Sequence, residues 1–305
     1  MQHANTYSEI SANASVQNQI GASVMGLCFV LGVPGNIITI VFIVHHFRKE
    51  NFSLHLMLNL AISDLLCLMT LPVWIYYLLH EWIFGSAVCK LLFTVGTVTM
   101  NTSVLTVTLM SVHRYLFVLH RTQWARLGRR GETALLGLVW VLACALSVAS
   151  ALKAGTVEKG ATVACHRLFT GDGETLAILL VEFLLGFVIP FSVLVTSYCR
   201  LHTNVNKTVF FKNQRLTSLV LKIVVTFFIF SSPVYLMFAV EILAYALKPF
   251  HPHVAENILA FYEKCANIAI SLIFINCCVN PFLYAFASKK LFAGADKSKQ
   301  DNNAV

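Results

Sequence analysis

Residues 91–112 read LLFTVGTVTMNTSVLTVTLMSV, a run of 22 residues without a charged side chain, and His113 and Arg114 follow it directly. As a helix, the stretch from Cys89 to His113 would be about 36 Å long. The hydrocarbon core of a bilayer is about 30 Å thick. We therefore predict that this run crosses a membrane and that Arg114 lies where the helix leaves it.

The rest of the chain has the same apolar character. Of its 305 residues, 57% are hydrophobic and 12% are charged, and the mean hydropathy is +0.73, whereas soluble domains carry about 25% charged residues. Because a spanning helix needs roughly 20 mostly apolar residues, we predict an all-α membrane protein, a seven-transmembrane helix bundle. The expected spans are about 19–45, 53–80, 86–119, 131–154, 174–203, 213–247 and 254–286.

The distribution of basic residues predicts the orientation. With the N-terminus outside the cell, 16 of the 22 Lys and Arg residues fall on the cytosolic side and 6 on the extracellular side, as the positive-inside rule requires. Residues 1–18 then form an extracellular tail with a glycosylation sequon at Asn13. Residues 19–286 form the bundle in the plasma membrane, and 287–305 are cytosolic. The net charge of +8 indicates topology and contact with anionic membrane lipid, and not nucleic-acid binding.

We single out eight polar side chains inside the expected spans, where hydrocarbon makes such groups costly and function is the usual reason for them. They are Asn36, Asp64, Asn101, Ser103, Glu182, Asn267, Asn276 and Asn280. The alternative for each is a satisfied hydrogen bond between helices. Asp64 has no Lys or Arg near it in the sequence, so it is expected to take up a proton or a cation. Neutral oxygens of Ser103, Asn276 and Asn280 would complete a small hard-cation site if these helices converge.

Two of the nine cysteines, Cys89 and Cys165, lie in segments that face the oxidising side. A disulfide between them is expected. Cys265 also lies near that side, so counting alone leaves the pairing open. No Cys or His cluster has the spacing of a metal site.

Prolines in four spans predict hinge points: Pro72, Pro190, Pro233 and Pro281. A bundle hinged on several helices can move one end relative to the other. A transporter uses the same device, but the chain shows no inverted repeat, and seven spans do not divide into two matching halves.

Together these residues resemble the rhodopsin-like (class A) G-protein-coupled receptors over about residues 20–292. The motifs occur in order, one per span: Asn36, LNLAISD ending at Asp64, Cys89, HRY at 113–115, Trp140, Pro190 with Tyr198, Pro233, and NPFLY at 280–284. The resemblance implies a receptor, not an enzyme, that promotes nucleotide exchange on a heterotrimeric G protein and has arrestin as a further possible partner.

The resemblance also implies roles for single residues. Asp64, Ser103, Asn276 and Asn280 would bind a sodium ion that favours the resting state; no other cofactor is expected. Cys89 and Cys165 would form the disulfide, and a short amphipathic eighth helix would lie within 287–305. The residues expected to act in coupling and activation are His113, Arg114, Tyr115, Tyr198, Phe227, Ser231, Pro233, Asn280, Pro281 and Tyr284.

The sequence departs from the family pattern around Arg114. The acid that usually precedes this arginine is His113 here, and the position of the acid at the start of the sixth helix is Asn213. The family's tryptophan two residues before Pro233 is Ser231. A neutral histidine offers at most a hydrogen bond to the arginine. We therefore hypothesise a weakly locked resting state and high basal signalling.

The expected ligand site lies between the outer thirds of the helices. The position of the aminergic receptors' aspartate is Gly96, and that of the opsins' lysine is Phe274. We therefore expect no amine anchored at Gly96, and Phe274 cannot form a Schiff base with retinal. Glu182 in ILLVEFLLGFVIPF, together with GVPGN at 32–36, resembles the leukotriene B4 receptors. The ligand-binding candidates are Thr97, Met100, Lys153, Arg167, Glu182, Tyr235, Phe238, Asn267 and Ser271.

The leading hypothesis is a receptor for a lipid mediator, a leukotriene-like hydroxylated fatty acid. Glu182 would bind ligand hydroxyls, and Lys153 or Arg167 would bind the carboxylate. The alternatives are a receptor for a chemoattractant peptide or chemokine and an atypical scavenging receptor. Inhibitory G proteins are favoured by analogy with chemoattractant receptors.

Overall fold

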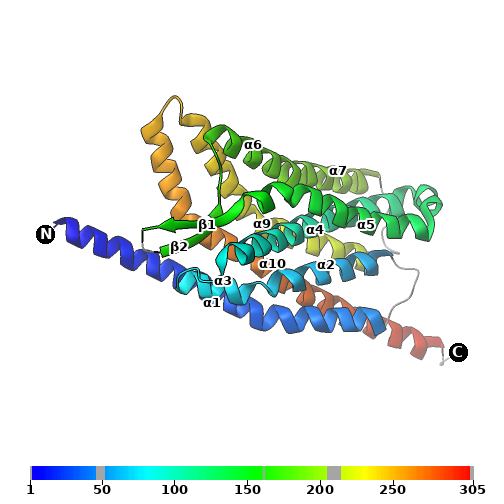
Figure 1. Ribbon diagram of the computed structural model, residues 1–305. Coiled ribbons are helices and arrows are strands. Elements are labelled where there is room, and N and C mark those ends of the chain that lie inside the picture. The colour runs from blue at the N-terminus through cyan, green and yellow to red at the C-terminus, as the bar shows by residue number, and fades with distance from the viewer. Residues whose placement is uncertain (1, 46–51, 161, 205–213, 303–305) are drawn as a thin grey trace.

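The computed structural model describes residues 2–45, 52–160, 162–204 and 214–302 (Figure 1). Within these residues seven segments are long and apolar enough to cross a membrane: Val16–His45, Phe52–Leu79, Gly85–Leu119, Arg121–Lys153, Asp172–Leu201, Ser218–Leu247 and Pro252–Leu283. Large apolar side chains face outward, among them Val30 (66% exposed), Ile38 (67%) and Leu152 (74%). Apolar residues on the outer surface are what a lipid solvent requires. The predicted seven-transmembrane bundle is confirmed.

The elements, in chain order, are α1 (Gln2–His45), α2 (Phe52–Leu68), α3 (Leu71–Leu79), α4 (Gly85–Leu119), α5 (Arg121–Lys153), β1 (Ala154–Lys159), β2 (Thr162–Arg167), α6 (Asp172–Phe183), the π-helix η1 (Leu184–Val188), α7 (Ile189–Asn204), α9 (Gln214–Leu247) and α10 (Pro252–Asn302). The second span consists of α2 and α3. The fifth span consists of α6, η1 and α7.

Prolines account for the interruptions of two spans. Pro72 lies in the first turn of α3, and the helix before it, α2, ends at Leu68 because a proline cannot donate to the preceding turn. In the fifth span the π-helix ends at Val188, two residues before Pro190. A π-turn contains one extra residue and so redirects the side chains that precede it. Pro233 and Pro281 lie inside α9 and α10, which continue through them.

The last helix is longer than expected. The sequence predicted a separate eighth helix, but α10 runs without interruption from Pro252 to Asn302. Residues 282–293 contain neither proline nor glycine, so the backbone has no reason to end the helix near 286. The predicted eighth helix is therefore the continuation of α10. The side chain of Tyr284 lies outside the described part of the chain, as does Asn213.

Two other helices also begin earlier than predicted. α1 begins at Gln2, so residues 2–15 of the expected tail are helical; the side chain of Asn13 is not among the described ones. α5 begins at Arg121, and its first turns are separated from the expected span by a non-helical residue at Gly128 (φ 61°, ψ 178°). Positive φ values of this kind suit glycine.

A β hairpin that the sequence did not predict lies at one end of the bundle, which we call the hairpin end (Figure 1). β1 and β2 pair antiparallel, with Ala154 opposite Arg167 and Lys159 opposite Thr162. Gly160 in the turn between them has φ +64°, a conformation that glycine adopts at little cost. The hairpin positions Arg167 at the end of its second strand.

Hydrogen bonds between helices hold the interior of the bundle. Buried Asn36 donates to the carbonyl oxygen of Cys277 at 2.9 Å and so joins α1 to α10. Asn59 donates to Thr106 at 2.7 Å and accepts from Trp140 at 2.8 Å, which joins α2, α4 and α5. In a membrane such bonds and close packing replace the hydrophobic drive between helices. For Asn36 the structure therefore favours the alternative reading, a hydrogen bond between helices.

Candidate ligand cavity and coupling site

A cavity of about 1260 Å³ extends from the β hairpin into the bundle as far as Asp64. Seven of the nine predicted ligand-binding residues line it: Thr97, Met100, Arg167, Glu182, Tyr235, Phe238 and Asn267. A concave site with mostly apolar walls and a few polar groups is the usual form of a small-molecule site. The cavity is therefore the candidate ligand site, and the ligand contacts of these residues stay predictions.

Lys153 and Ser271 do not line the cavity. Lys153 ends α5 and forms an ion pair with Glu174 in the first turn of α6. Ser271 is buried and donates to the carbonyl oxygen of Asn267 at 2.7 Å, on the side of α10 that faces Gly21 of α1. Spacing along the sequence did not show the direction in which their helices present these two side chains.

A half-buried ion pair lies in the cavity wall. Arg167 donates from Nη1 to Oε2 of Glu182 at 2.7 Å, and Ser150 donates to Oε1 of the same carboxylate at 2.6 Å. The guanidinium of Arg167 lies 5.3 Å from the ring centroid of Phe169 and 5.9 Å from that of Phe238, within the range of cation–π attraction. Burial alone would lower the pKa of Arg167, but the facing carboxylates raise it above its ordinary value. Arg167 therefore stays charged.

Aromatic packing next to this pair depends on the π-helix. Gly186 in η1 lies so close to α9 that a Cβ there would be 3.0 Å from Oη of Tyr235. Tyr235 stacks on Phe187 with ring centroids 4.8 Å apart and meets Phe238 edge-on at 5.9 Å. This cluster forms the wall of the cavity between the fifth and sixth spans.

The carboxylate of Glu241 is part of the same wall, and the sequence reasoning missed it. Glu241 of α9 is 8% exposed, lines the cavity, and its Oε2 has no hydrogen-bond partner. It lies inside an expected span, so the rule that selects charged side chains in spans should have found it. Among the described lining residues the acids are Asp64, Glu81, Glu182, Glu241 and Glu263, and Arg167 is the one Lys or Arg.

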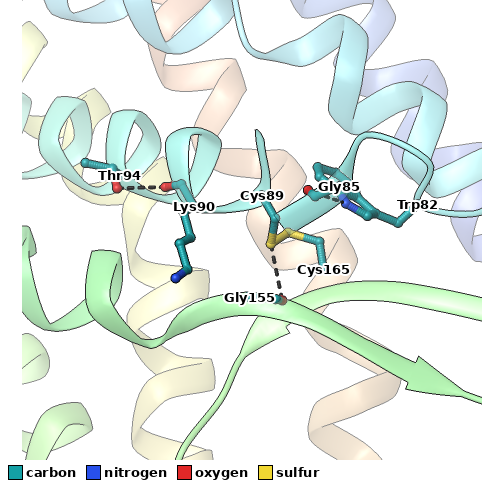
Figure 2. Close-up of a disulfide and its surroundings, with 7 residues drawn as sticks. All are labelled: Trp82, Gly85, Cys89, Lys90, Thr94, Gly155 and Cys165. Atoms are coloured by element: carbon teal, nitrogen blue, oxygen red, sulfur yellow. Dashed lines mark hydrogen bonds between the residues drawn. A yellow bond between two sulfur atoms is a disulfide. The ribbon is translucent and has the colours of Figure 1, made fainter. Parts of the chain in front are cut away.

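Figure 2 shows the disulfide that joins the hairpin to α4. Cys89 at the start of α4 is bonded to Cys165 in β2, with the two Cα atoms 5.7 Å apart. Nearby, Trp82 donates to the carbonyl oxygen of Gly85 at 3.0 Å. The predicted pairing is confirmed, and Cys265 is a free cysteine.

Asp64 forms the inner end of the cavity. Asn280 donates to its Oδ2 at 2.7 Å, and Ser103 lies 3.5 Å from its Oδ1. The side-chain oxygens of Asn276 and Asn280 are buried without a partner. Carboxylate, hydroxyl and amide oxygens are the ligands of a hard cation. Of the four predicted residues, Asp64, Ser103 and Asn280 are thus brought together, and Asn276 lines the same cavity; sodium binding stays a prediction.

At the opposite end of the bundle Arg114 is 2% exposed, and its Nε and Nη2 have no hydrogen-bond partner. None of the ion pairs found in the described residues includes it. The hydroxyl of Tyr198 is likewise buried without a partner. Among the described residues, Arg114 therefore has no carboxylate partner, as the histidine at position 113 led us to expect.

The side chain of His113 packs against aromatic rings of other helices. Its ring lies 4.6 Å from that of Trp124 and 5.2 Å from that of Phe52, and its Nδ1 is 3.4 Å from Oγ of Ser53. The next residue, Tyr115, contacts His120 at 3.3 Å. Of the remaining coupling residues, Phe227 and Ser231 are buried and line the inner part of the cavity.

Comparison with known proteins agrees with this arrangement. The family of 7 transmembrane receptors (rhodopsin family) matches residues 35–284, and the chain belongs to this family. Its relatives include apelin receptor A of Danio rerio (31% identical; 85% of this chain and 76% of the relative). The C3a anaphylatoxin chemotactic receptor of Danio rerio is also 31% identical (85% and 70%), and C-C chemokine receptor 1-like protein 1 of Mus musculus is 28% identical (87% and 74%).

The protein is therefore a multi-pass plasma-membrane receptor and not an enzyme, and its partners are a ligand and a G protein. The resemblance to leukotriene B4 receptors stays a prediction.

Proposed function

We propose that the receptor binds a lipid mediator, a leukotriene-like hydroxylated fatty acid, in the cavity and then activates heterotrimeric G proteins of the inhibitory type. The hairpin end faces the outside of the cell, and the end with Arg114 faces the cytosol. The excess of Lys and Arg in the loops at that end supports this orientation. Arrestin binding and glycosylation of Asn13 belong to the same proposal.

The half-buried guanidinium of Arg167 is the observation that carries the lipid proposal. It is the one Lys or Arg among the described lining residues, and aromatic rings flank it. A guanidinium has five N–H donors in a planar fork that matches a carboxylate. The apolar side chains of Met100 and Phe238 in the lining suit a hydrocarbon chain.

Arg114 supports the coupling step. A buried guanidinium with two unpartnered nitrogens is costly, so a G-protein segment that accepts its hydrogen bonds is stabilised on binding. Because ligand and G protein favour the same state, each increases the affinity of the other.

A sodium ion at Asp64 would favour the opposite, resting state. The unpartnered oxygens of Asn280, which contacts this carboxylate, and of Asn276, which lines the same cavity, fit a hard cation. Asp64, Ser103 and Asn280 would hold the ion, which would supply a positive charge between α2, α4 and α10.

A basic chemoattractant peptide is the second candidate ligand. The described lining holds five acidic side chains against one arginine, and this balance favours a cationic ligand. The names of the relatives, which include chemokine, apelin and C3a receptors, point the same way.

The two candidates are separated by a screen of hydroxylated fatty acids and basic chemotactic peptides for G-protein activation in cells. We expect a fatty acid to activate the wild type and Arg167→Gln to reduce its potency by about 10- to 100-fold, the range for a charge-assisted hydrogen bond. Activation by a peptide alone, unaffected by Arg167→Gln, would contradict the lipid proposal.

A further inference from the structure

The carboxyl group of Glu241 takes no part in the proposed binding of the ligand carboxylate at Arg167. Its side chain is 8% exposed, it lines the cavity, and its Oε2 lacks a hydrogen-bond partner. Tyr262 of α10 forms a hydrogen bond with this carboxyl group, and the charge of Arg167 also acts on it, so Oε2 is the atom that remains without a partner. None of the ion pairs among the described residues includes Glu241.

Glu182 cannot easily take the part that the sequence assigned to it. Both of its oxygens are already engaged, one by the hydroxyl of Ser150 at 2.6 Å and the other by Arg167 at 2.7 Å. A ligand hydroxyl could reach Glu182 only through the second lone pair of an oxygen that already accepts a hydrogen bond. The carboxylate that still has an open acceptor atom is Glu241.

We propose that Glu241 is a ligand subsite that accepts a hydrogen bond from a hydroxyl group of the ligand, next to the carboxylate subsite at Arg167. A buried acceptor without a partner costs free energy that a ligand donor recovers. A fatty acid without a hydroxyl would leave Oε2 unpaired under the bound chain. Glu241 therefore selects hydroxylated over plain fatty acids. This inference rests on the proposed lipid function.

The test compares two probes on purified receptor in nanodiscs: leukotriene B4, which carries hydroxyls, and arachidonic acid, which carries none. We expect the wild type to bind the hydroxylated acid about 10- to 100-fold more tightly, the range for a hydrogen bond to a charged group. Glu241→Leu removes the acceptor and should abolish this ratio while arachidonic acid binding stays within a few-fold of wild type. Glu256→Gln, an exposed position of α10 outside the cavity lining, is the matched control and should keep the ratio.

Each outcome decides the proposal. If the wild type binds both acids equally, or if Glu241→Leu keeps the full ratio, Glu241 is no hydroxyl subsite, while the lipid function stands. If neither acid binds the wild type, both the subsite and the lipid function are wrong. A thermal unfolding curve of Glu241→Leu shows whether the variant is folded; if it is not, Glu241→Gln, which keeps the volume but replaces one oxygen by an N–H donor, should reduce the ratio at least several-fold.

Discussion

Removing the charge of Glu182 distinguishes an anionic from a cationic ligand by the sign of its effect. Glu182→Gln keeps the size of the side chain and an acceptor for Ser150, but it removes the negative charge that lies 2.7 Å from Arg167. In the wild type that charge repels a carboxylate on the open side of the guanidinium. It attracts a basic group in the same place.

The size of the effect follows from Coulomb's law. A ligand carboxylate on the far side of the guanidinium would lie about 6 Å from the carboxylate of Glu182, and two like charges at that distance repel by about 2.8 kcal/mol at an effective dielectric constant of 20. The two side chains are 15% and 18% exposed, so water screens part of this. About half, or 1.4 kcal/mol, corresponds to a tenfold change in affinity.

We therefore expect Glu182→Gln to bind a hydroxylated fatty acid about tenfold more tightly in a competition binding assay, and a basic peptide about tenfold more weakly. Because Arg167 loses its partner, the variant should also unfold at a lower temperature. Glu174→Gln breaks the pair with Lys153 outside the cavity lining and should change neither affinity. A fatty-acid affinity that falls as far as it does in Arg167→Gln would refute the reasoning.

Three further predictions concern the rest of the bundle. His113→Asp should lower basal nucleotide exchange, because it supplies Arg114 with a carboxylate; unchanged basal output in a G-protein assay would refute the weak-lock hypothesis. Gly32→Ala should destabilise the receptor by about 1–3 kcal/mol, because the added Cβ would lie 2.7 Å from a methyl group of Leu68 in α2. Gly26→Ala is the control, because its Cβ would have no neighbour within 4 Å and should leave the melting temperature unchanged. Equal melting temperatures of the two variants would contradict the packing argument. Asp64→Asn should abolish any decrease of agonist affinity caused by sodium, and a decrease that survives the substitution would place the ion elsewhere.

The sequence was sufficient for the fold because lipid imposes a strict constraint. A chain in hydrocarbon must satisfy its backbone hydrogen bonds within each segment, so apolar runs such as 91–112 become helices whatever their neighbours are. The hairpin at 154–167 could not be found in this way. It is held by pairing across a glycine turn and by the bond between Cys165 and Cys89, and both depend on the folded bundle.

The sequence predicted most of the chosen residues that line the cavity, but not which way each side chain faces. Arg167 and Glu182 were both chosen, yet the sequence did not show that they neutralise each other. Ser271 was also chosen but faces α1, because the rotation of a helix that is apolar all round leaves no clear pattern. Glu241 lies inside the expected span 213–247, so its charge alone is enough to mark it as a candidate functional residue.

Nucleotide exchange on a purified inhibitory-type G protein tests the central claim most directly. With the receptor in nanodiscs, a hydroxylated fatty acid should increase GTPγS binding in the wild type. Arg167→Gln should shift the response to about 10- to 100-fold higher ligand concentration. Uptake of the ligand across the membrane without any increase in exchange, or an identical response in Arg167→Gln, would contradict the claim that ligand binding in this cavity drives the G protein.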